Sequence, residues 1–200
     1  MTDAWKNGLA AIALVTLPLV AACSDTEEHT AQGATRDDGT LTLAAALGAE
    51  KDLDIVREAM EESELSGVLD GPASYTILAP DDAAFEALGK EGETLLEDEQ
   101  RPVLVALLED EQRPVLVALL RDHLLPGHLT PESIGEAIDR KGGPVTMATL
   151  GETAVIFSRE GDGIKAELED GGSASFAGTA TATNNGVVIP ISQVLMPPKD

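Results

Sequence analysis

Residues 75–88 read YTILAPDDAAFEAL and contain the signals of a strand and of a helix in direct succession. The first five of these residues, from Tyr75 to Ala79, predict a short buried strand that ends at Pro80. The remainder predicts a helix, because the carboxylates of Asp81 and Asp82 precede apolar residues at helical spacing. The stretch therefore predicts a strand that passes at once into a helix.

The rest of the chain divides into a helical part and a strand-rich part. Residues 41–47 and 53–60 carry apolar residues at helical spacing, and Asp52 suits the start of the second helix. Later residues alternate Val, Thr and Ile between glycine-rich breaks, which predicts strands at 145–150, 152–158, 164–168, 173–183 and 187–195. Helices that come first and strands that come later favour a segregated α+β domain.

Three segments of the chain together resemble one known family, the fasciclin domains. Residues 75–88 resemble the family's first signature (T-x-F-A-P-T-x-x-A-F), and residues 185–198 (NGVVIPISQVLMPP) resemble its second (N-G-V-I-H-V-I-D-x-V-L-x-P). Residues 122–127 (DHLLPG) resemble the Y-H-x-x-P-G element between them. The resemblance covers residues 40–198 and implies a single fasciclin-like domain, with N-terminal helices packed on C-terminal β-sheets.

The chain departs from the family pattern at a few positions. Asp81 stands where the first signature has Thr, and Asp122 stands where the middle element has Tyr; the Tyr-His pair is the element linked with integrin adhesion in animal members. The second signature has Ile189, Pro190 and Ser192 in place of His, Val and Asp. Because Pro190 has no N–H, its position in the strand must face an edge, a bulge or solvent.

The residues that carry polar chemistry favour structural roles over catalytic ones. His123 lacks a nucleophile motif nearby, and the resemblance implies that its ring ties a helix end to the first signature. Asp81 and Asp82 suit helix capping better than cation binding, and Asn185-Gly186 predicts a turn. We therefore expect no catalytic residues, no metal site and no cofactor, and these five residues are candidates for structural or interaction roles.

The N-terminus carries the pattern of a lipoprotein signal peptide. Residues 9–22 form an apolar run that is too short to span a bilayer comfortably and that ends Val20-Ala21-Ala22 before Cys23, the only cysteine. This resembles the lipobox of bacterial lipoproteins, in which the cysteine is acylated and becomes the first mature residue. The alternative is an ordinary secretory signal with a chance cysteine, which would leave an unpaired thiol in an oxidising compartment.

These signals predict the domain organisation and the location of the protein. Residues 1–22 are the signal peptide, residues 23–39 are an acidic flexible tether that includes His29, and the domain spans 40–198. We expect export across the inner membrane and lipid anchoring to the cell envelope. Ser24 after the cysteine favours the outer membrane, facing the periplasm or the cell surface.

The charge of the chain excludes several partners. With 36 Asp and Glu against 13 Lys and Arg, the net charge is −23, which repels phosphate backbones and argues against nucleic-acid binding. Anionic membrane surfaces are repelled as well, so membrane attachment has to be hydrophobic or covalent.

A direct repeat interrupts the middle of the chain. Residues 95–106 (LLEDEQRPVLVA) are followed at once by an identical copy at 107–118, within the tandem duplication 95–118. One helix through both copies would place Pro114 in its interior, which costs about 3 kcal/mol, so we expect two short helices or one strong kink. Only the second copy runs directly into His123, so we expect it to fill the family's helix position and the displaced first copy to favour self-association.

The sequence therefore favours a lipid-anchored extracytoplasmic adhesion or matrix protein that binds a protein or glycan ligand at the cell surface and is not an enzyme. The alternative is an envelope-structural or accessory protein that binds other envelope proteins and has no adhesive role.

Overall fold

The fold is described from a computed structural model, for residues 33–63, 65–88 and 113–196. The predicted signal peptide, Cys23, His29 and the first copy of the repeat lie outside these residues. The predictions made for them therefore remain predictions.

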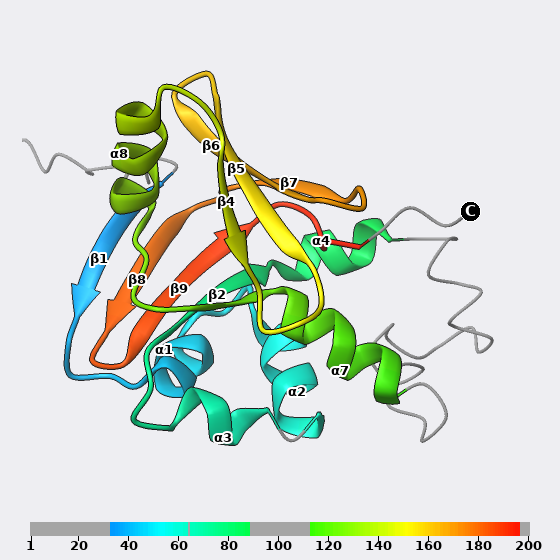
Figure 1. Cartoon of the computed structure of the whole chain (residues 1–200). Helices are drawn as coiled ribbons and strands as arrows, with labels where there is room; N and C mark the ends of the chain where they lie inside the picture. Colours follow the sequence, from blue (N-terminus) through cyan, green and yellow to red (C-terminus); the bar gives the residue numbers. More distant parts are fainter. Residues whose placement is uncertain (1–32, 64, 89–112, 197–200) are drawn as a thin grey trace, which may run out of the picture.

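The described strands form two sheets (Figure 1). The five-stranded sheet has the order β1-β8-β9-β2-β3, and the four-stranded sheet has the order β4-β5-β6-β7. The strands are β1 (Ala34–Asp38), β2 (Tyr75–Pro80), β3 (Leu124–Pro126), β4 (Val145–Ala148), β5 (Ala154–Glu160), β6 (Gly163–Leu168), β7 (Ser173–Ser175), β8 (Thr179–Thr183) and β9 (Gly186–Ile191).

Helices cover the five-stranded sheet from one side, and α8 lies apart from them beside β1 and the second sheet (Figure 1). The helices are α1 (Leu43–Ala49), α2 (Asp54–Glu62), α3 (Ser66–Leu69), α4 (Asp82–Ala87), α7 (Arg113–Asp122) and α8 (Pro131–Lys141).

The interior strand β2 is buried on both faces. Ile77 and Ala79 point into the core formed with α1, α2, α3, α4 and α7, whereas Leu78 between them points into the core shared with the second sheet. Its parallel neighbour β9 alternates in the same way. Two cores on opposite faces require apolar side chains on both faces of the strand, which explains why Ile77, Leu78 and Ala79 follow one another without a polar residue between them.

The α+β class is confirmed, but the division into N-terminal helices and C-terminal sheets is too simple. β2 pairs in parallel with β9 over six residue pairs, so an early strand lies inside the five-stranded sheet, between the late strand β9 and β3. The parallel pairing explains this, because a parallel neighbour need not be adjacent in sequence.

The prediction of a flexible tether over residues 23–39 is wrong for the C-terminal part of that range. Residues Ala34–Asp38 form β1, which pairs in parallel with β8 from Ala34↔Thr179 to Asp38↔Thr183. An edge strand can expose much of its surface, so β1 can be built from polar residues. Its sequence therefore lacks the apolar alternation from which a strand is predicted. The ordered domain therefore begins before residue 40.

Helix α8 begins and ends with clear capping signals, although the sequence predictions did not include this helix. The Thr130 hydroxyl accepts a hydrogen bond from Ser133 N, and Ser133 Oγ accepts one from Thr130 N. Pro131 stands at the first helical position, and Gly142 ends the helix in the left-handed region at φ 71°.

Pro190 lies where its missing N–H costs little. The β8–β9 ladder is confined to Val187 and Val188, so Pro190 lies beyond its end. The Pro190 carbonyl accepts a hydrogen bond from Ala177 N in the connection before β8. The position thus tolerates proline although β9 is a central strand.

Helix α7 contains the end of the second repeat copy and docks one face in the core. Leu116 and Leu120 are buried, whereas Val115 is 54% exposed. The helix lies at the margin of the helical layer, where only one stripe faces a partner.

The two repeat copies offer a matched test of which one is docked. Leu116→Ala removes a fully buried side chain and should lower the free energy of unfolding by about 2–5 kcal/mol. Leu104→Ala changes the equivalent residue of the first copy and should cost less than about 0.5 kcal/mol. Urea unfolding of both variants measures the difference, and a larger cost for Leu104→Ala would overturn our assignment of the copies.

Candidate functional site

The imidazole of His123 joins the end of α7 to the C-terminal segment. The side chain is buried, with 1% of its surface exposed. Its Nδ1 lies 2.9 Å from the Leu119 carbonyl oxygen, and its Nε2 lies 3.0 Å from Leu195 N. The ring therefore satisfies one of the carbonyls that a helix leaves unpaired at its C-terminus.

These partners define the protonation state of the ring. Because a carbonyl can only accept, Nδ1 carries the proton, and because the Leu195 amide donates, Nε2 accepts. Burial lowers the pKa of His123 and outweighs the Leu119 hydrogen bond and the nearby Asp122 charge, which raise it. The neutral tautomer with the proton on Nδ1 is the form that fits this site.

His123 brings the three signature segments together, but not quite as the resemblance implied. The ring contacts Leu195, in the second signature, whereas the first signature is reached through the backbone: Leu78 N donates to the His123 carbonyl at 2.9 Å. The expectation that the ring itself contacts the first signature is therefore wrong.

Asp122, which stands in place of the family's tyrosine, fixes the loop between β4 and β5. One carboxylate oxygen accepts from the Thr153 hydroxyl at 2.6 Å and from the Thr149 hydroxyl at 3.1 Å. Gly151 passes so close that a Cβ there would meet this carboxylate. The substitution is visible in the sequence, but its partners lie 27 and 31 residues away and no local pattern points to them.

Asp81 and Asp82 cap two different helices. Asp81 Oδ1 accepts from Ala84 N at 2.7 Å, which caps α4. Asp82 Oδ1 accepts from Ile55 N at 3.0 Å in the first turn of α2, whose N-cap Leu53 has no side-chain oxygen to offer. Asp52, the predicted start of α2, instead accepts from Asp82 N through its carbonyl. Both carboxylates thus act at helix N-termini.

Asn185 and Gly186 form the predicted turn and also join it to the helical layer. Asn185 Oδ1 accepts from Leu43 N at 2.7 Å, and its amide donates to the carbonyls of Leu69 and Gly71. A Cβ at Gly186 would meet the carbonyl of Tyr75, so glycine is required for the close approach of β9 to β2. The pattern predicted the turn, and nothing in it predicted these contacts.

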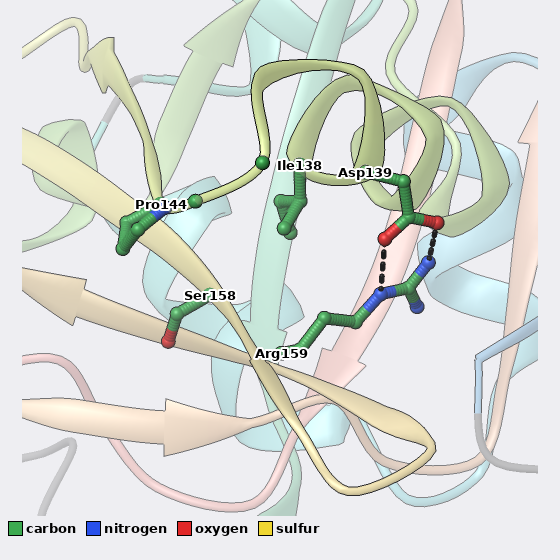
Figure 2. A pocket seen from close by; sticks show the side chains of 7 residues that line it. Ile138, Asp139, Pro144, Ser158 and Arg159 are labelled. Carbon is green, nitrogen blue, oxygen red and sulfur yellow. Dashed lines mark hydrogen bonds and ion pairs between the residues drawn. The ribbon is translucent and has the colours of Figure 1, made fainter.

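A surface hollow of about 500 Å³ lies where the C-terminal end of α8 meets β5 (Figure 2). Its rim carries an ion pair in which the Arg159 guanidinium donates to both oxygens of Asp139, at 2.6 and 3.2 Å. These hydrogen bonds lower the pKa of Asp139. The remaining lining comes from Ile138, Gly142, Gly143, Pro144 and Ser158.

This hollow contains none of the residues that the sequence singled out. A second hollow of about 260 Å³ borders the same ion pair and extends toward Gly33 and Phe176. In the larger hollow, the charged lining side chains are Arg159 and Asp139, which are paired with each other. The arrangement offers a shallow contact surface and no nucleophile–base pair.

The residues that the structure describes contain no group of three His, Cys, Asp or Glu side chains placed to hold a metal ion. Within them, no helix has the length and apolar character needed to cross a membrane.

Comparison with known proteins identifies the fold. The family model for the fasciclin domain matches residues 51–197. A solved FAS1 domain pair from the insect cell adhesion molecule Fasciclin I is similar at 21% identity with a TM-score of 0.50. That match covers 70% of this chain and 45% of the solved chain, so this protein spans less than half of that structure. No match was found among curated protein sequences.

The buried imidazole predicts a loss of stability in acid. Because the folded state lowers the pKa of His123 below 6.5, the unfolded state binds more protons below that pH, and stability falls as pH drops. The loss is at most about 1.4 kcal/mol per pH unit. The free energy of unfolding should be measured from about pH 7.5 to about pH 5.5 for the wild type and for His123→Gln.

His123→Gln should be less stable at neutral pH, by about 1–2 kcal/mol, because a buried hydrogen bond is lost. Its stability should depend less on pH than that of the wild type. Parallel pH profiles for the two proteins would exclude His123 as the titrating group.

The Asp122 contact predicts contrasting effects at two glycines. Gly151→Ala places a methyl group against the Asp122 carboxylate and should cost about 1–3 kcal/mol. Gly143→Ala has no atom within 4 Å of the added carbon and should stay within about 0.5 kcal/mol of the wild type. Thermal unfolding checks both, and adding Asp122→Ala to Gly151→Ala should cost less than the two changes summed. Equal effects at the two glycines would contradict this account.

Proposed function

The chain belongs to the fasciclin domain family, and we propose that it is a lipid-anchored extracytoplasmic member that acts in adhesion or matrix interaction. The observation that carries the proposal is the combination of this family match with the sequence Val20-Ala21-Ala22-Cys23 at the end of a short apolar run. The solved relative is a cell adhesion molecule. The ligand we propose is a protein or glycan at the cell surface.

The position of β1 is compatible with an anchor at Cys23. Ten residues, 24–33, separate the cysteine from the first strand. A chain of that length reaches at most about 35 Å, so the domain would be held close to the bilayer. The acyl chains would supply the membrane affinity that a net charge of −23 cannot.

The absence of an enzymatic role is part of the same proposal. The family that matches is one of adhesion-type domains and not an enzyme family. The polar side chains at the meeting point of the signature segments are engaged with helix ends and loops. Because these side chains make structural contacts, the function that we propose is binding through an exposed surface.

Acylation of Cys23 can be tested directly. Mass spectrometry of the mature N-terminus should show a diacyl or triacyl group on Cys23 and no residues from 1–22. Cys23→Ser should release the protein from the membrane fraction, while Ser24→Ala serves as the matched control that keeps the anchor. An unmodified Cys23, or cleavage at another residue, would contradict the proposed anchor.

The adhesive role needs a separate experiment. A strain that lacks the gene should attach less to surfaces and form less biofilm, and the wild-type gene should restore attachment whereas Cys23→Ser should not. Affinity purification from solubilised envelope, run in parallel, identifies bound proteins. Unchanged attachment together with stable envelope partners would favour the alternative, an envelope-structural or accessory protein without an adhesive role.

A further inference from the structure

Strand β1 is the place where the N-terminal segment enters the folded domain. It lies at the edge of the five-stranded sheet, before the residues matched by the family model. Its pairing with β8 covers five residue pairs, and Gly33 N donates to the Gly178 carbonyl to extend the ladder by one more contact. Any pull on the N-terminal segment therefore reaches the domain through this strand.

Side chains on both faces of β1 fasten it to other elements. Arg36 donates to Glu50 Oε1 at 2.6 Å and to the Thr181 hydroxyl at 3.2 Å, and Thr181 also donates to Glu50. Thr35 donates to Glu132 Oε2 of α8 at 2.6 Å. These contacts connect a strand of five residues to β8, to the end of α1 and to α8.

The direction of the pairing decides how β1 carries a force. β1 and β8 are parallel, so Gly33 and Gly178 lie at one end of the ladder, and Asn184 follows β8 at the other end. Strand hydrogen bonds run across the strands. A pull along β1 from its N-terminus against the far end of the domain therefore loads all the bonds together, whereas a sideways pull would break them one at a time.

We propose that β1 is the force-bearing junction between the membrane tether and the domain, and that the β1–β8 ladder with its Arg36–Glu50–Thr181 and Thr35–Glu132 contacts resists that force in shear. The proposal rests on the proposed function in one respect, since the tether leads to a membrane only if Cys23 is acylated. Arg36 and Asp37 of β1 are largely exposed, so these residues contribute little to the hydrophobic core. The proposed role in bearing force gives the edge strand a function besides burial.

Optical-tweezers measurements with two pulling geometries test the proposal on the full chain. Cys23→Ser leaves no native cysteine, so that Ala31→Cys can carry one handle in both proteins. Asn184→Cys supplies the second handle for shear, and Thr179→Cys, opposite Ala34 in the ladder, supplies it for peeling. We expect the unfolding force to be several-fold higher in shear. Equal forces in the two geometries would overturn the proposal.

The side-chain contacts are tested in the shear geometry. The double variant Thr35→Val, Arg36→Ala should unfold at a clearly lower force, whereas Arg57→Ala, which removes ion pairs within α2, should leave the force unchanged. Equal forces for the double variant and Arg57→Ala would show that the contacts bear no load. Because these proteins are not acylated, the outcome does not depend on the anchor, whose own failure appears in the mass of the mature N-terminus.

Discussion

The hydrogen bonds of one buried imidazole constrain the rest of this domain. His123 lies at the end of α7, and its ring accepts from the Leu195 amide while donating to the Leu119 carbonyl. Its own carbonyl accepts from Leu78 in β2. Segments that lie more than 100 residues apart in sequence, β2 and the residues after β9, are thereby held to the same helix end. A buried ring with two partners tolerates little displacement of any of them, because an unpaired polar group in the core is costly.

Other polar contacts extend this arrangement outward from the core. Asn185 holds the β8–β9 turn to α1 and α3, Asp82 caps α2 from α4, and Asp122 holds the β4–β5 loop. Such contacts suit a chain with few aromatic residues. The ring pair Phe157–Phe176, with centroids 6.0 Å apart, is the only aromatic contact among the described residues, and the cores are otherwise aliphatic. Aliphatic cores fill space but specify geometry weakly, and directional hydrogen bonds supply that specificity.

The parts of the fold that the sequence predicted are those with a strong local signal. The apolar run of β2 and the acidic start of α4 lie side by side, and the alternating strands after residue 144 have clear turns between them. β1 escaped prediction because its residues are polar and its pairing with β8 is remote. The capping box and Pro131 of α8 are local signals that could have been used.

The roles of the candidate site residues also divide into those with a local signal and those without one. The capping role of Asp81 can be predicted from the residues that follow it, and the turn at Asn185-Gly186 can be predicted from the dipeptide itself. The contacts of Asp82, Asp122 and Asn185 join residues distant in sequence, and a single sequence contains no trace of such pairs. Family resemblance located His123 correctly between the signatures, but only the structure identifies Leu195 as its partner.

The central claim, that the neutral imidazole of His123 holds the C-terminal segment to α7, is tested most directly by NMR. Nitrogen chemical shifts of the ring should show the proton on Nδ1 and an accepting Nε2, and the Leu195 amide should exchange its hydrogen only through global unfolding. A ring whose proton resides on Nε2, or a Leu195 amide that exchanges as fast as the exposed loops, would contradict the account.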